Sequence, residues 1–223
     1  HTKKRVVEIN ATNSIINVVN NAIQSQDTEV DDVEGTNDDC VKIVSLRNKK
    51  KLKLRYNPNH SAYQIYQRLM QKEDLFTPSV VSYHNETIID PSDNDVSIPC
   101  TFLITEYVDG IVLRDYKRSQ GKIELDHWYK YGQYVSKLHE VKNNMGAAVT
   151  FSAHLIDKSC VIYREDEDDV VMGGFETIQY GEVVDIDDFL DCSIIARASI
   201  PSEIEAFKDG YINNNVRNNN RVR

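Results

Sequence analysis

The spacing of hydrophobic residues changes along the chain, and each change marks an expected element. Three segments, 14–24, 60–71 and 123–144, repeat apolar residues at helical spacing. In the first, Thr12 or Asn13 is the expected N-cap; in the third, which is the clearest, it is Asp126. The expected buried faces of the second and third helices are Ala62, Ile65, Tyr66 and Leu69, and Trp128, Tyr131, Val135 and Leu138.

Other segments alternate apolar and polar residues with the period of a β-strand. Residues 40–46 and 52–56 lie on either side of a basic turn and predict a hairpin. Further strands are expected at 80–83, 87–89 and 101–106, and a second hairpin at 159–165 and 168–175. The acidic segment 25–39 has few apolar residues and is expected to be an exposed loop. Closing helices are predicted at 185–198 and 201–212.

This order of elements predicts an α+β protein with two lobes, a small β-rich N-terminal lobe and a mainly helical C-terminal lobe, joined near Val108. The expected boundaries are 1–39 for an N-terminal helix and acidic loop, 40–108 for the N-lobe, 109–212 for the C-lobe and 213–223 for a disordered tail.

The composition narrows the function classes. The formal net charge of -9 argues against a general binder of nucleic acid or of membrane surfaces. No apolar run reaches the roughly 18–20 residues that a bilayer span needs. We expect a soluble, intracellular protein, located in the cytoplasm. The four cysteines form no CxxC pair, so zinc is not expected, and they are interpreted as buried apolar residues: Cys40, Cys100, Cys160 and Cys192.

Five short motifs follow one another in the second half of the chain. They are FLITEYVDGIVLRDY at 102–116, YGQYVSKLHEVK at 131–142, SAHLIDKSCVIY at 152–163, VVMGGFETIQYGE at 170–182 and EAFKDGY at 205–211. In this order they resemble the aminoglycoside and choline phosphotransferase-like branch of the protein-kinase-like fold, and most of all its fungal members. The resemblance covers roughly residues 40–212 and implies the bilobal protein-kinase-like fold.

The same resemblance places degenerate residues where catalytic groups are expected. His154 stands at the position of the catalytic aspartate, and Asp157 belongs to the retained part of that loop. Ser159 and Gly174 stand at the two metal-binding positions, whereas Glu176 is retained. Phosphoryl transfer needs carboxylates that hold magnesium and orient the nucleophile, and glycine has no side chain to offer as a ligand.

In the N-lobe, the resemblance puts Arg55, or Lys53 after a register shift of two, at the position of the phosphate-binding lysine, and Glu106 in the hinge strand. Helix 59–69 contains no glutamate to steady such a cation, and 46–53 contains no glycine-rich phosphate loop. Strand alternation predicts that Lys51 shares a face with Lys53 and Arg55. This basic face is either simply solvated or a contact for an anion or a partner.

Three hypotheses follow from these residues. The favoured one is a pseudokinase that binds a protein partner, or a nucleotide or small molecule in the cleft between the lobes, without a required cofactor. The second is an active small-molecule phosphotransferase, using ATP and magnesium in a site rebuilt from His154, Asp157 or Glu176, or from the acidic residues of 185–188. The third is a purely structural or immunity-type interaction protein whose cleft is filled.

Overall fold

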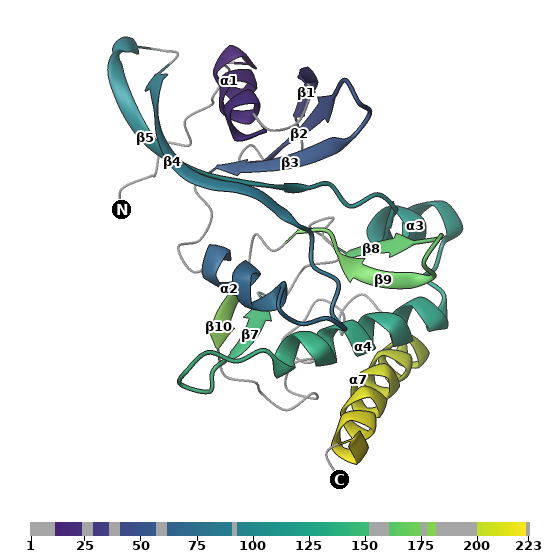
Figure 1. Cartoon of the computed structure of the whole chain (residues 1–223). Helices are drawn as coiled ribbons and strands as arrows, with labels where there is room; N and C mark the ends of the chain where they lie inside the picture. The colour runs from purple at the N-terminus through teal and green to yellow at the C-terminus, as the bar shows by residue number, and fades with distance from the viewer. Residues whose placement is uncertain are drawn as a thin grey trace, which may run out of the picture. The chain divides into compact units, whose positions relative to one another are not determined.

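The computed structural model divides the chain into two compact units, which are described separately (Figure 1). Unit 1 consists of His1–Tyr63 with Pro78–Tyr107, and unit 2 of Gln64–Thr77 with Val108–Arg223. The structure describes residues 12–23, 29–35, 41–56, 62–90, 93–151, 161–174, 178–181 and 200–221. Among these residues, no helix has the length and apolar character needed to cross a membrane.

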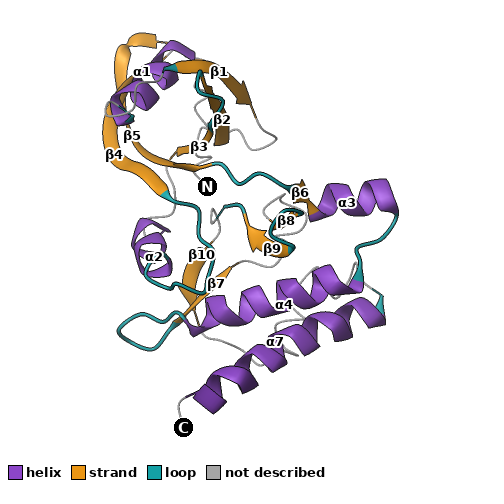
Figure 2. Ribbon diagram, turned by 45° about the vertical axis from the view of Figure 1, so that its right-hand side comes forward, coloured by secondary structure: helices purple, strands orange, loops and turns teal. Residues whose placement is uncertain are grey.

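Unit 1 is a five-stranded antiparallel sheet with one helix against it (Figure 2). The strands are arranged in the order β1-β2-β3-β5-β4. Their bounds are β1 (Val30–Gly35), β2 (Val41–Leu46), β3 (Lys51–Tyr56), β4 (Val80–Asp90) and β5 (Asp93–Glu106), and the helix is α1 (Thr12–Ala22).

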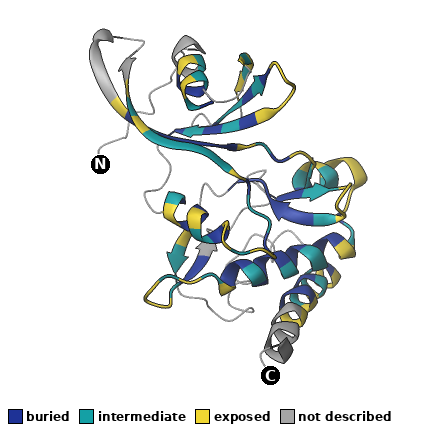
Figure 3. Cartoon of the chain, viewed as in Figure 1, coloured by how far each residue is buried: buried dark blue, intermediate teal, exposed yellow. Residues whose placement is uncertain are grey.

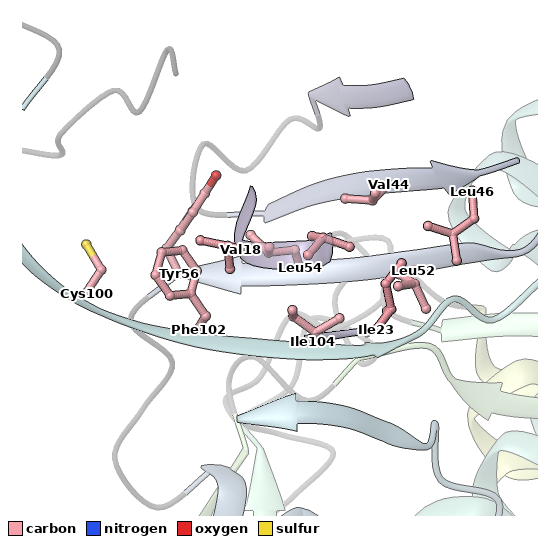
Figure 4. Packing of buried hydrophobic residues seen from close by; sticks show 11 residues of the cluster. Val18, Ile23, Val44, Leu46, Leu52, Leu54, Tyr56, Cys100, Phe102 and Ile104 are labelled. Atoms are coloured by element: carbon pink, nitrogen blue, oxygen red, sulfur yellow. The ribbon is translucent and has the colours of Figure 1, made fainter. Parts of the chain in front are cut away.

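The core of unit 1 forms between α1 and one face of this sheet (Figure 4). Along β3, the alternating residues Leu52, Leu54 and Tyr56 are buried, whereas the residues between them are half-buried or exposed. α1 contributes Val18 and Val19 to the same cluster. The predicted first helix and the β2–β3 hairpin are therefore confirmed, and both arise from the burial of one apolar face.

Two strand predictions in unit 1 were wrong. The acidic segment expected to be a loop contains β1, because Val30 and Val33 pack against the core cluster while the acidic side chains between them face outward. The strands expected at 80–83 and 87–89 are one strand, β4, which stays paired with the long strand β5 across both regions.

Unit 2 contains four helices and two small sheets in its described residues. The helices are α2 (Ala62–Leu69, from Gln64 onward in this unit), α3 (Leu113–Gln120), α4 (Leu125–Glu140) and α7 (Pro201–Arg221). One sheet has the order β6-β8-β9 and the other is the pair β10-β7. The bounds are β6 (Ile111–Val112), β7 (Ala148–Phe151), β8 (Val161–Arg164), β9 (Asp169–Met172) and β10 (Ile178–Gly181).

The helix predicted from the apolar repeat of 123–144 is confirmed as α4, and one side of it is buried (Figure 3). All four residues of its predicted apolar face are buried. Its N-cap is Glu124 in an extended conformation, so the prediction of Asp126 as the cap was wrong. Asp126 lies instead in the first turn, where a carboxylate interacts favourably with the helix dipole.

Helix α7 packs on α4 at two glycines. A Cβ atom on Gly132 would lie 2.1 Å from the carbonyl oxygen of Phe207, and one on Gly210 would lie 1.9 Å from that of Tyr129. The rings of Tyr131 and Phe207 meet edge to face at the same contact, with centroids 5.2 Å apart. The absence of side chains at these two positions is what allows the helix backbones to approach so closely.

α7 also overturns one boundary prediction, because residues 213–221 continue the helix instead of forming a disordered tail. The segment is rich in asparagine and has little helix propensity of its own. Once the turns around Phe207 are held against α4, each further residue adds to an existing helix without a new nucleation cost.

Several side-chain contacts attach the α2 region to the rest of unit 2. Lys72 pairs with Glu140, and the hydroxyl of Tyr134 donates to the carbonyl of Phe76 at 2.8 Å. The guanidinium of Arg164 lies 4.1 Å from the centroid of the Phe76 ring. The Lys137 ammonium donates to the carbonyl of Asp74. The Arg68 guanidinium donates to acceptors in the 142–144 loop.

We expect Gly132→Ala or Gly210→Ala to destabilise the protein by about 2 kcal/mol or more, because a new methyl group would overlap backbone atoms of the facing helix. Urea denaturation of each variant measures this effect. Glu205→Ala, at an exposed position of α7, is the matched control and should change stability by about 0.5 kcal/mol at most. Equal stabilities for all three variants would contradict the close contact.

Candidate functional site

The ends of four strands in unit 2 bring together the two segments that carry the predicted catalytic positions. Segment 152–160 joins Phe151 of β7 to Val161 of β8, and segment 173–177 joins Met172 of β9 to Ile178 of β10. Phe151 is the cross-strand partner of Ile178, and Val161 is the partner of Met172. Both segments therefore start and finish at the same two paired positions.

Gly174 lies next to one of these paired positions and is buried. The preceding residue, Gly173, passes tightly over β8, because a Cβ atom there would lie 2.2 Å from Cδ1 of Ile162. The position that the resemblance equates with a metal-binding aspartate therefore directly follows a residue whose backbone lies close to the Ile162 side chain. The backbone of Gly174 could contribute only its amide and carbonyl groups to a ligand.

The other predicted residues of the C-lobe site lie outside the described residues. These are His154, Asp157, Ser159 and Glu176, together with the acidic residues of 185–188. The roles assigned to them stay predictions. Within the described part of the chain, no three His, Cys, Asp or Glu side chains are grouped closely enough to hold a metal ion.

In unit 1, strand β3 places the predicted cations on one face of the sheet, as alternation suggested. Lys53 lies opposite Thr105 of β5, and Arg55 lies opposite Leu103. Both basic residues are half-buried, whereas Lys51 is exposed. The buried apolar cluster occupies the opposite face of β3, so the three cations share the face that points away from α1.

Glu106, the predicted hinge residue, ends β5 and is exposed. Its amide donates to the carbonyl of Ser79 at 2.9 Å. The next amide, of Tyr107, donates to the carbonyl of Lys51 at 3.1 Å, and the Lys51 ammonium lies 5.9 Å from the centroid of the Tyr107 ring. These contacts tie the last residues of β5 to the start of β3.

The strand β1 changes where a phosphate-binding loop should be sought in unit 1. From the sequence, the expected place was 46–53, which contains the β2–β3 turn. The structure adds an earlier hairpin, in which Gly35 of β1 pairs with Lys42 of β2 around the connection 36–40. That connection reads TNDDC, with two aspartates and no glycine. Its negative charge is unsuited to covering phosphate groups.

Two of the motifs behind the resemblance meet in the α4–α7 contact. His139 belongs to the Leu-His pair at the end of α4, and Tyr211 ends the Phe-Lys-Asp-Gly-Tyr motif. The Nδ1 atom of His139 and the hydroxyl of Tyr211 are 2.9 Å apart in a buried hydrogen bond. Burial lowers the pKa of His139 to about 4. These motif residues thus support the fold of unit 2 and keep a neutral imidazole inside it.

An ionic and aromatic cluster on unit 2 was not predicted from the sequence. The Lys130 ammonium of α4 contacts Asp126 at 2.5 Å and Asp168 at 2.6 Å. Hydrogen bonds from Lys130 and from the hydroxyl of Tyr163 lower the pKa of Asp168. The ring centroids of His127 and Tyr163 are 4.0 Å apart. Burial, and after it the charge of Lys130, lowers the pKa of the His127 imidazole.

This cluster fastens the β8–β9 turn to α4. Asp168 has a positive φ of 49°, a left-handed conformation that is uncommon for a residue other than glycine. The contact from Lys130 holds its carboxylate in place. Lys130 and Asp168 are far apart in the sequence, so no local pattern marked this pair. The only related signal was the predicted hairpin at 159–165 and 168–175, whose second strand was expected to begin at Asp168.

Comparisons with known proteins show the fold. No protein-family model matches the chain, and no curated protein matches it. The crystal structure of an aminoglycoside phosphotransferase from Alicyclobacillus acidocaldarius is 9% identical, with a TM-score of 0.54, and the match covers 82% of this chain and 73% of that one. A likeness at this identity shows the fold alone.

Two other solved structures are similar at lower TM-scores. The bifunctional kinase-methyltransferase WbdD is 9% identical with a TM-score of 0.47, and the chain spans 46% of its length while 82% of this chain is covered. Rad53 in complex with AMP-PNP is 14% identical with a TM-score of 0.41, and the match covers 68% of this chain and 39% of that one. The predicted fold class is confirmed: the chain has an α+β, protein-kinase-like bilobal fold.

The pKa of His139 leads to a pH prediction. Its folded-state pKa of about 4 lies below the ordinary value of 6.5, so the neutral imidazole stabilises the fold above pH 6.5. That contribution is lost as the pH falls from 6.5 toward 4. At pH 4.5 the loss of stability amounts to about 2–3 kcal/mol.

We expect His139→Gln to lose less stability than the parent protein between pH 7.5 and pH 4.5, measured by urea denaturation at both pH values. The partly exposed His84 of unit 1, changed to Gln, serves as the control. A parallel loss in the parent and in His139→Gln would show that His139 does not titrate as its burial requires.

Proposed function

We propose that this chain is a pseudokinase: a protein with the kinase-like phosphotransferase fold that no longer transfers phosphate and acts by binding a partner or a ligand. The buried Gly174, held next to the paired strand ends, carries the proposal. A phosphotransferase needs a magnesium-binding carboxylate at the position that the resemblance assigns to this residue. Glycine has no side chain and so can supply only its backbone amide and carbonyl groups.

The electrostatics of unit 1 support the same conclusion. β3 retains Lys53 and Arg55 on one face, but α2 begins without a glutamate to steady a phosphate-binding lysine. The β1–β2 connection carries Asp38 and Asp39, whose charges repel phosphate groups. The glycine at position 174 and the acidic sequence of the β1–β2 connection are separate features that both disfavour phosphate transfer.

The proposal extends to cofactors, partners and origin. We infer a protein partner, or a nucleotide or small molecule held between the lobes, and no required cofactor. Because the motifs resemble fungal members of the phosphotransferase-like branch, we further infer a fungal protein that works in the cytoplasm. ATP and magnesium enter only if His154, Asp157 or Glu176 forms a rearranged site, which is the competing function.

A thermal-shift titration with ATP, ADP and GTP, each with and without magnesium, tests the proposal. A nucleotide at 100 times its Kd would stabilise the native state by about 2.7 kcal/mol. We expect no magnesium-dependent increase in Tm for this chain. The aminoglycoside phosphotransferase from A. acidocaldarius, measured in the same plate, is the positive control.

A magnesium-dependent shift would favour the rearranged enzyme. The variants Asp157→Asn and Glu176→Gln then identify the rebuilt site, because each removes one carboxylate charge with little change in shape. Loss of the shift in either variant, together with ATP turnover in the parent, would overturn the pseudokinase proposal.

A further inference from the structure

A shallow polar depression that is largely open to solvent, called the α2 cavity below, lies on the outer side of α2, opposite the face whose apolar residues are buried. Its volume is about 400 Å³, and it is lined by Gln64, Gln67, Arg68 and Gln71. These positions follow the spacing i, i+3, i+4 and i+7, which places them on one side of the helix and of the turn that follows it. All four residues belong to unit 2.

Arg68 supplies a positive charge that no described carboxylate neutralises. Its Nη1 atom donates to the carbonyl oxygen of Lys142 at 2.8 Å, and its Nη2 atom donates to Oδ1 of Asn144 at 2.9 Å. Both acceptors are neutral. A guanidinium has five N–H donors, so these two bonds leave donors available and hold the group in position. A guanidinium held in this way is suited to bind a carboxylate through paired hydrogen bonds.

The three glutamines add neutral donors and acceptors on both sides of this charge. Each side-chain amide can donate and accept at once, as the peptide group of an extended chain also does. From Gln64 to Gln71, a helix rises about 10 Å, which is the length of about three residues in an extended strand. The cavity therefore offers a short polar track with a cation near its centre.

The surroundings of the cavity favour a negatively charged occupant. The nearby cation Lys72 is already paired with Glu140, which leaves the charge of Arg68 in excess.

We propose that the α2 cavity binds an extended acidic peptide segment of a partner protein. A Glu or Asp side chain of the peptide pairs with Arg68, and its main-chain amides hydrogen-bond to Gln64, Gln67 and Gln71. The α2 cavity would therefore select a partner that presents an acidic, extended segment. This proposal does not depend on whether the chain transfers phosphate.

Fluorescence anisotropy with the full chain and a labelled eight-residue peptide of alternating Glu and Ala tests this site. The matched probe is the same peptide with Gln in place of Glu. We expect the acidic peptide to bind at least tenfold more tightly than the Gln peptide. The assay contains no nucleotide, so its outcome is independent of the thermal-shift result.

Two variants locate the binding. Gln67→Glu keeps the side-chain shape and the contacts of Arg68, and it should weaken binding of the acidic peptide at least tenfold because it adds a negative charge. Arg68→Gln should also weaken binding at least tenfold, because it removes the cation. The controls make the same charge changes on α3, at exposed positions, as Gln120→Glu and Arg118→Gln, and should leave binding unchanged.

Four results would overturn the proposal. One is equal binding of the Glu and Gln peptides, and another is binding that Gln67→Glu does not weaken. The third is full competition by inorganic phosphate at the concentration of the peptide, which would indicate a simple anion site. If replacing Asp185, Asp187 and Asp188 by Asn were needed before the peptide could bind, the occupant would be this chain's own acidic segment, and a partner peptide would be excluded.

Discussion

The pairing of strand ends in unit 2 is the constraint on which the candidate site depends. Phe151 with Ile178, and Val161 with Met172, fix where segments 152–160 and 173–177 begin and finish. A slip of one residue in either ladder would turn every side chain of that strand to the opposite face, burying polar groups and exposing apolar ones. The pairing depends on the buried apolar residues of these strands, so it does not require the chemical groups of the predicted catalytic positions.

The sequence was informative wherever one face of an element is apolar and buried. β2, β3, α2 and α4 were predicted from spacing alone because their buried faces recur with a single period. β1 was missed because half-buried Val30 and Val33 are its only apolar residues among acidic ones. The polar helix α3 gave a weak signal for a similar reason, with Leu113 as its only buried residue.

Non-local contacts explain what the sequence could not predict about the site. β7 and β10 pair across a separation of 27 residues at Phe151 and Ile178, so neither four-residue strand had a local partner to reveal it. The cluster of Lys130 with Asp168 depends on the same kind of long-range approach. By contrast, the shared face of Lys53 and Arg55 needed only strand alternation and was predicted correctly.

The attachment of α2 to unit 2 means that this unit is built from two separate stretches of the chain. Segment 64–77 lies between two strands of unit 1 in the sequence, yet its side chains bond to α4 and to the β8–β9 hairpin. Unit 2 therefore needs both segment 64–77 and the residues after 107 to fold completely, and residues 78–107 of unit 1 connect these two parts.

The single tryptophan of the chain makes this division accessible to spectroscopy. Trp128 lies in α4, within unit 2, and is 1% exposed. Its intrinsic fluorescence therefore reports the opening of unit 2, whereas unit 1, which has no tryptophan, contributes through its tyrosines. Comparing the tryptophan emission with the far-ultraviolet circular dichroism signal during unfolding would separate the cooperative transition of one lobe from that of the other.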